Sequence, residues 1–152
     1  MTYQHTQIGY AILGSMLAGA LIMAAIILPI QDELAGTSGL SIVGLVCLVL
    51  LVSAVLFATL SIEVGEDAVV AKFGPGLIRK KISLADIASC EAVKNSWAYG
   101  WGIRKIPGGW LYNVSGTKAV EIRHQNGKKT RLGTDEPDQL LEALQRALES
   151  RG

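Results

Sequence analysis

The side chains best suited to recognising a ligand gather in one stretch, WAYGWGIRKIPGGWLY, at residues 97–112. It holds all three tryptophans of the chain, four glycines and an adjacent Arg-Lys pair. Tryptophan and tyrosine favour the membrane–water interface, where arginine and lysine reach lipid headgroups beside them. The first part of the stretch therefore predicts a flexible aromatic and basic loop that either binds lipid or a partner or packs on the domain. Its candidate binding residues are Trp97, Tyr99, Trp101, Arg104 and Lys105.

The end of the same stretch predicts packing rather than binding. Trp110 and Tyr112 occupy alternate positions of an expected strand and so share one face of it. We expect that face to lie in the interior of the domain, with the preceding glycines allowing the loop to fold close over it.

A second candidate binding surface is the basic hairpin around Gly74-Pro75-Gly76. Lys72 precedes this turn, and Arg79 and Lys81 follow it on one face of the next strand, with Lys80 on the other. These cations suit a lipid phosphate or an acidic protein, but charge on an edge hairpin also discourages pairing with other chains. Both interpretations stay open. The basic strand of residues 128–132 is expected to be an ordinary solvated face.

The chain offers little for catalysis. His124 is expected to be exposed beside a turn, and Asp86 and Glu91 fall at different strand phases, so no carboxylate pair is predicted. Cys47 and Cys90 lack C-x-x-C spacing and are expected to be single buried thiols. We therefore predict no enzyme, no metal site and no cofactor.

Two long apolar runs, residues 8–30 and 40–60, precede the first basic residue, Lys72. Each is about as long as the ~20 residues that cross a bilayer. The leader MTYQHTQ has no basic residue, which favours a retained span over a cleaved signal peptide. Residues 1–60 are thus predicted to form a two-helix transmembrane hairpin. The positive-inside rule places both termini in the cytoplasm and the protein in the cell (inner) membrane.

Small residues recur every fourth position in the first predicted span, at Ala11, Ser15 and Gly19. Such a stripe lets another helix approach closely. The partner is either the second span of the same chain or a second copy of the protein.

Residues 61–152 are predicted to form a cytoplasmic domain of short strands that ends in a helix. Residues 61–64 form either a first strand or the last turn of the second span, and Asn126-Gly127 indicates a tight hairpin. Pro137 in the first turn and a leucine/alanine face from Leu140 indicate an amphipathic helix. The expected strands are residues 68–73, 77–82, 87–93, 110–114, 119–124 and 128–132. This order is typical of an α+β fold, an antiparallel β-sandwich or barrel capped by a C-terminal helix.

The segments VVAKFGPGLIRKKISLADIASCEAV and GWLYNVSGTKAVEIRHQNGKKTRLGTDEPDQLLEALQ resemble bacterial membrane proteins that carry a pleckstrin-homology-like (PH-like) domain. The resemblance covers about residues 61–150, and the two preceding spans are similar to the usual layout of that group. It implies a PH-like fold but little about activity. In phosphoinositide-binding members of the wider superfamily, basic residues on the first two strands around such a loop hold phosphates.

The sequence as a whole favours a non-enzymatic integral membrane protein whose PH-like domain binds lipid headgroups or a partner protein as a scaffold. The alternative is a structural subunit of a homo-oligomeric membrane assembly. The domain has 14 basic and 11 acidic residues, a balance that does not suit nucleic acid binding.

Overall fold

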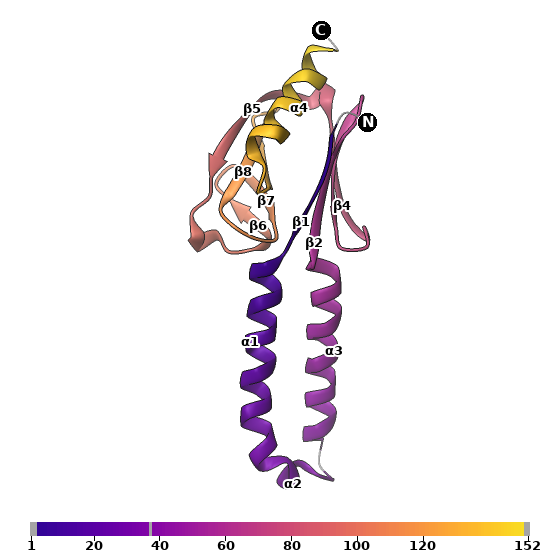
Figure 1. The fold of residues 1–152 in the computed structure, drawn as a ribbon, viewed down its shortest axis with the longest axis vertical. Coiled ribbons are helices and arrows are strands. Elements are labelled where there is room, and N and C mark those ends of the chain that lie inside the picture. Colours follow the sequence, from indigo (N-terminus) through magenta and orange to yellow (C-terminus); the bar gives the residue numbers. More distant parts are fainter. Residues whose placement is uncertain (1–2, 37, 151–152) are drawn as a thin grey trace.

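The computed structural model, which describes residues 3–36 and 38–150, places a β-rich domain at one end of a pair of long helices (Figure 1). Four helices, three short 3-10 turns and nine strands are present in these ranges. In chain order they are β1 (Tyr3–Ile8), α1 (Tyr10–Ile27), η1 (Leu28–Ile30), α2 (Gln31–Leu34), α3 (Gly39–Phe57), β2 (Thr59–Val64), β3 (Ala68–Phe73), β4 (Ile78–Ser83), η2 (Leu84–Asp86), β5 (Ile87–Lys94), η3 (Trp97–Tyr99), β6 (Gly102–Ile106), β7 (Gly109–Asn113), β8 (Lys118–His124), β9 (Lys129–Gly133) and α4 (Pro137–Glu149).

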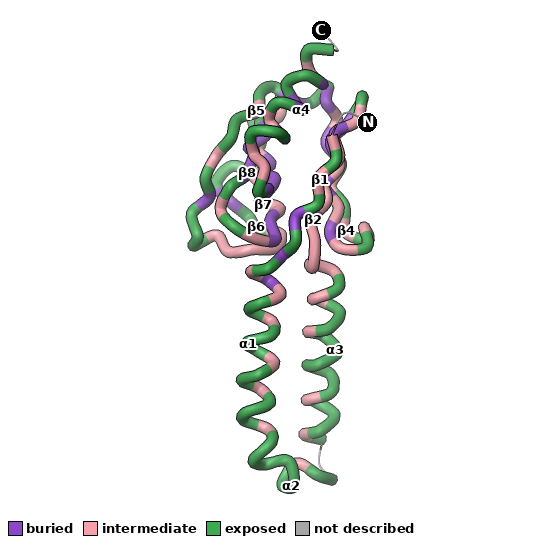
Figure 2. The backbone as a smooth tube through the Cα atoms, in the orientation of Figure 1, coloured by how far each residue is buried: buried purple, intermediate pink, exposed green. Residues whose placement is uncertain are grey.

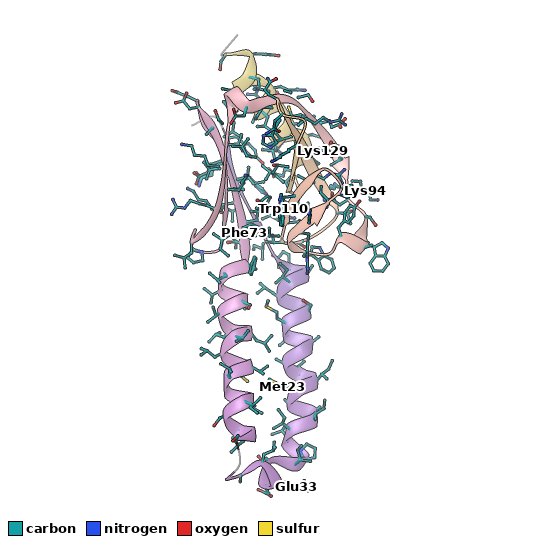
Figure 3. The ribbon with its side chains drawn as sticks, turned by 180° about the vertical axis from the view of Figure 1, so that it is seen from behind. Met23, Glu33, Phe73, Lys94, Trp110 and Lys129 are labelled. Atoms are coloured by element: carbon teal, nitrogen blue, oxygen red, sulfur yellow. The ribbon has the colours of Figure 1, made fainter. Side chains whose placement is uncertain are left out.

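The helices α1 and α3 form an antiparallel hairpin that leaves most of its apolar side chains uncovered. Figure 2 shows exposed and half-buried positions along both helices, whereas buried positions concentrate in the domain. The segments Tyr10–Leu34 and Gly39–Phe57 have mean hydropathies of 2.5 and 3.0 and are long and apolar enough to cross a membrane. The contact between the helices is narrow. On α1 it follows half-buried Met16, Ala20 and Met23, of which Met23 is labelled in Figure 3.

Residues 3–8, just before helix α1, contribute a strand to the domain. β1 pairs antiparallel with β2, from Tyr3 opposite Val64 to Ile8 opposite Thr59. The predicted division at residue 60 had assigned all of this segment to the hairpin. The two strands pair because each continues directly from the same end of the helical hairpin, so they leave it side by side (Figure 1). Residues 1–2 and 151–152, at the ends of the two predicted units, lie outside the described ranges.

Two sheets make up the domain. The first has the order β1-β2-β3-β4 and is antiparallel throughout, so residues 61–64 belong to a strand. The second has the order β5-β8-β9-β7-β6, in which β7 runs parallel to β9 and the other pairs are antiparallel. The expected turn at Asn126-Gly127 joins β8 to β9, with Gly127 at φ +81°.

The prediction of a loop up to Lys105 is wrong in its second half. Gly102–Ile106 is strand β6, which pairs with β7 through a turn containing Gly108 at φ +83°. Only glycine adopts such a φ without strain, so the Pro-Gly-Gly sequence that looked like loop is the turn of a hairpin.

The core lies between the sheets and under α4. The buried face of α4 is Leu140, Ala143, Leu144 and Ala147, close to the predicted stripe, and Pro137 opens the helix as expected. Phe73 of β3 packs edge-to-face against Phe57 of α3, with ring centroids 5.4 Å apart. A fully buried side chain of this size contributes roughly 2–3 kcal/mol. The same core therefore joins the domain to the helical hairpin.

Candidate ligand groove at the junction of helices and domain

A groove of about 590 Å3 lies where α1 and α3 meet the second sheet. The helices supply one wall and the start of β6 the other. Its lining residues are Ile12, Ser15, Met16, Ser53, Phe57, Gly100, Trp101, Gly102, Ile103 and Arg104. It therefore takes in two of the predicted aromatic and basic residues, Trp101 and Arg104.

Trp101 is held in place by two glycines and by the opposite strand connection. Gly100 and Gly102 have φ values of +67° and +94°, so the chain turns on both sides of the tryptophan. Its indole Nε1–H donates to the carbonyl oxygen of Gly116 at 3.2 Å, and its ring packs against the core. Trp101 thus forms one wall of the groove.

Arg104 supplies the positive charge of the groove. Its Nε–H donates to the carbonyl oxygen of Trp101 at 2.9 Å, which fixes the start of the guanidinium. A Cβ built on Gly100 would lie 3.9–4.0 Å from that guanidinium, so the arginine rests over the glycine. No ion pair joins Arg104 to another residue in the part of the chain that the structure describes. The remaining guanidinium N–H groups are left to a ligand or to solvent.

The other side chains that line the groove offer few polar groups that need a hydrogen-bond partner. Ile12 is 8% exposed, and Met16, Phe57 and Ile103 pack against the core cluster. Ser15 Oγ donates to the carbonyl oxygen of its own helix at Ile12, at 2.8 Å. A largely apolar groove with one positively charged side chain, Arg104, at its rim suits an amphiphile with an anionic headgroup.

The other residues of the aromatic stretch lie apart from this groove. Trp97 is 82% exposed in η3, and Tyr99 is half-buried. Lys105 follows Arg104 in strand β6 and so points to the opposite face. Trp110, predicted in the core, is 47% exposed, although Tyr112 on the same face does pack there. Lysines from both sheets, together with Trp110, line a cavity at that end of the sandwich.

The basic hairpin does not reach the groove either. Arg79 and Lys81 are exposed on one face of β4, as the alternation predicts. Lys72, opposite Arg79, is bound by both carboxylate oxygens of Glu63 at 2.7 and 2.8 Å. Its charge is thus largely neutralised on the outer face of the first sheet, which leaves Arg79 and Lys81 as the available cations of this hairpin.

Two residues of the small-residue stripe, Ser15 and Gly19, are exposed. A Cβ built on Gly19 would meet no atom within 4 Å, so Gly19 does not pack against the second span of the same chain. Ser15 lines the groove that α3 helps to form. Ala11, at the domain end of the helix, is half-buried.

Glu121 is the principal charged residue that the sequence did not single out. It is 1% exposed, yet Arg131 Nε lies 2.7 Å from one carboxylate oxygen and Lys129 Nζ and Arg123 Nε each lie 3.2 Å from the other. Burial alone would raise its pKa, but the hydrogen bonds from Arg131 and Lys129 outweigh burial and hold the pKa below its usual range. The alternation of β8 could have flagged a glutamate flanked by cations on β9, but not its burial.

Of the residues considered for catalysis, His124 and Asp86 lie at the same corner of the domain. His124 is half-buried rather than exposed, with Nε2 2.8 Å from Thr130 Oγ1. Cys47 is exposed on α3 because nothing covers that helix, and burial raises the pKa of half-buried Cys90. Within residues 3–36 and 38–150 no three His, Cys, Asp or Glu side chains are grouped to hold a metal ion.

Compared with protein-family models, curated proteins and solved structures, the chain matches none of them. Its function therefore has to be argued from its own geometry.

Proposed function

We propose that this protein is a non-enzymatic membrane protein whose domain holds a phospholipid in the junction groove. The single observation that carries the proposal is the pairing of an apolar channel between α1, α3 and β6 with the fixed cation of Arg104 at its rim. Acyl chains would follow the helices, and the headgroup phosphate would accept hydrogen bonds from Arg104.

The level of the groove relative to the two helices supports a lipid as its occupant. Strand β1 ends just before α1 begins at Tyr10, and strand β2 begins just after α3 ends at Phe57, so almost no linker separates the helices from the domain. If the two helices span a bilayer, the groove lies at headgroup level. Two more apolar side chains are available there. The first is Leu77, which is 76% exposed and lies three residues after Gly74, a glycine in contact with the carbonyl groups at the end of α3. The second is Trp97, which is 82% exposed and lies three residues before Gly100, which lines the groove.

The charge distribution supports an orientation in the cell (inner) membrane. All 14 lysines and arginines fall at or after Lys72, while the α1–α3 connection carries only Asp32 and Glu33 as charges. Because β1 and β2 belong to one sheet, both ends of the hairpin stand on the side of the domain. The positive-inside rule makes that side cytoplasmic, together with both termini.

The order of elements supports a PH-like domain. Two largely antiparallel sheets enclose a core, and a C-terminal amphipathic helix covers it. The hairpin β6–β7 is an addition to the second sheet, joined through parallel pairing with β9. The domain can also act as a scaffold that binds a partner protein through Arg79, Lys81 and Trp97, none of which lines the groove.

Lipid retention by the full chain tests this function. The isolated segment 61–152 is unsuitable because it lacks β1 and the helical wall of the groove. The protein would be purified in mild detergent, and bound phospholipid would be counted by native mass spectrometry. We expect Arg104→Ala to weaken retention about tenfold, as for one hydrogen bond to a charged group. Ser53→Trp, which fills the groove, should abolish it.

Arg79→Ala is the matched control, because it removes an exposed arginine on the other sheet. Phospholipid retention that is the same in Arg104→Ala, Ser53→Trp and the unchanged protein would eliminate the groove as a lipid site.

A second candidate function is a structural subunit of a homo-oligomer, favoured by the uncovered face at Ser15 and Gly19. Native mass in detergent tests it. Gly19→Leu should dissociate the assembly, whereas Leu17→Ala, on another exposed face, should not. A strict monomer before any substitution would exclude this candidate.

A further inference from the structure

A second cavity, of about 660 Å3, opens at the other end of hairpin β6–β7. It lies between the β4 edge of the first sheet and the strands β6, β7, β8 and β9 of the second. Its lining residues are Lys80, Lys81, Ile82, Asp86, Lys105, Ile106, Gly108, Gly109, Trp110, His124, Asn126, Lys128, Lys129 and Thr130.

Strand alternation points side chains from both sheets into this space. Lys80 lies between Ile78 and Ile82, which face the core, and Lys105 shares a face with core-packed Ile103. Lys105 is opposite Trp110, which in turn is beside Thr130. The cavity is therefore the open corner of the sandwich, where the two layers present lysines instead of aliphatic residues.

The shape of the corner depends on two glycines. A Cβ on Gly109 would collide with the carbonyl oxygen of Lys129, so the tight parallel pairing of β7 with β9 accepts only glycine there. Gly108, at φ +83°, lies against the side chain of Lys129. This close seating of the hairpin brings Lys105 and Trp110 over the start of β9.

The cavity carries a strong excess of positive charge. Five lysines line it against one acid, Asp86. Lys129 forms an ion pair with Glu121, in which Nζ lies 3.2 Å from Oε1. The other four lysines form no ion pair with any residue of the described ranges. Concentrating cations in a concave site costs free energy in the absence of an anion and attracts one from solution.

His124 and Trp110 add two further side chains that can contact a ligand in the cavity. Burial, followed by the charges of Lys80 and Lys128, lowers the pKa of His124, an effect that Asp86 partly offsets. The imidazole is thus neutral at pH 7 and becomes a cation more readily once an anion is bound. Trp110, half-exposed at the rim, offers a flat apolar face for a ring.

The cavity is set back from the helices. Gly102 and Asn113 form the end of the β6–β7 hairpin near the junction groove, whereas Ile106 and Gly109 form the opposite end. Four residues of strand separate them, or about 13 Å. Figure 3 shows Lys129 in the part of the domain remote from the helical hairpin. This position favours a soluble ligand over a headgroup of the membrane that holds the chain.

We propose that this cavity binds a small soluble ligand that carries two or more phosphate charges and a flat ring, as a nucleoside polyphosphate does. Lys80 and Lys105 contact the phosphates from opposite sheets, Lys128 and His124 close the site, and Trp110 stacks on the ring. The site is independent of lipid in the junction groove.

Titration of the full chain in nanodiscs of zwitterionic lipid tests the proposal. Pyrophosphate and a nucleoside triphosphate would be added at low ionic strength, with calorimetry and tryptophan fluorescence as readouts. We expect saturable binding of both, tighter for the nucleotide, and weakening as salt rises. Lys80→Glu with Lys105→Glu should lower the affinity at least tenfold. Trp110→Phe should remove the fluorescence change, and Trp110→Ala should also remove the preference for the nucleotide.

The control variant is Lys94→Glu with Lys118→Glu, a cross-strand lysine pair at the other end of β5–β8. It makes the same charge change outside the cavity. Lys105→Gln, an isosteric change at an exposed position, keeps the test valid if the double variant does not fold. Absence of binding at millimolar concentrations of both probes would overturn the proposal, as would an equal loss in the control variant. Binding only to vesicles of anionic lipid, with no competition from soluble phosphate, would also overturn it.

Discussion

The two cavities of this protein share one β-hairpin and differ in almost every other respect. The junction groove has apolar helical walls and a single cation, Arg104, whereas the corner cavity has β-sheet walls and five lysines. Arg104 and Lys105 are neighbours in sequence, yet they line different cavities, because the groove meets the start of strand β6 and the corner cavity meets its end. A basic pair that looks like one patch in the sequence is therefore divided between two sites.

The two cavities also rest on different kinds of support. The groove is built on apolar packing that involves Phe57, Phe73 and Trp101. The corner cavity adjoins the ion-pair network of Glu121 through Lys129, which lines the cavity and lies 3.2 Å from that carboxylate. Substitutions that remove one support should leave the other intact, and the following predictions use this difference.

The largest effect is expected from Glu121→Ala. It leaves Arg131, 19% exposed, without its carboxylate, and removing one partner of a buried ion pair costs about 3 kcal/mol. Thermal unfolding in detergent, followed by near-ultraviolet circular dichroism, measures the loss. Glu91→Ala, which removes an exposed partner of Arg123, should leave the midpoint nearly unchanged. Equal midpoints for both variants would contradict the structural role of Glu121.

The same carboxylate predicts an acid dependence of stability. Because the pKa of Glu121 is depressed in the folded chain, its contribution is complete above the ordinary glutamate pKa of about 4.3. That contribution is lost as the pH falls through the folded value. Glu121→Gln should flatten this acid limb of the midpoint–pH curve.

Gly109→Ala is expected to have the next largest effect, about 2 kcal/mol, because its Cβ would collide with the backbone of β9. It should also abolish phosphate binding in the corner cavity while lipid retention in the groove persists. Gly65→Ala is the control, since its Cβ would come no closer than 3.4 Å to a neighbour. Loss of both ligands together in Gly109→Ala would show that the two cavities are not independent.

A smaller effect is expected on the titration of His124. An anion in the corner cavity stabilises the imidazolium, so its lowered pKa should rise when pyrophosphate is added. Proton NMR of the imidazole C–H resonances measures the change. No change in the His124 resonances on addition of pyrophosphate would place the anion elsewhere.

The smallest effect is expected from Lys72→Met. The Lys72–Glu63 pair lies on the outer face of the first sheet, where an ion pair contributes about 0.5 kcal/mol. Neither phospholipid retention nor phosphate binding should change, because Lys72 lines neither cavity. A clear loss of phospholipid retention in this variant would return the basic hairpin to consideration as the lipid site.

Local patterns in the sequence determined the elements whose signals are short-range. Uninterrupted apolar runs predicted α1 and α3, the Asn126-Gly127 pair predicted the β8–β9 turn, and the leucine/alanine spacing predicted α4. These signals suffice because helix periodicity, hairpin turns and membrane-length runs are properties of neighbouring residues.

Only the tertiary structure decided how distant segments combine. The pairing of β1 with β2 joins residues 51 or more positions apart, and the parallel pairing of β7 with β9 creates the corner in which Trp110 stays half-exposed. The burial of Glu121 depends on cations from β9, and the separation of Arg104 from Lys105 depends on β6 being a strand. Such relations follow from long-range register and packing, which no local period of the sequence records.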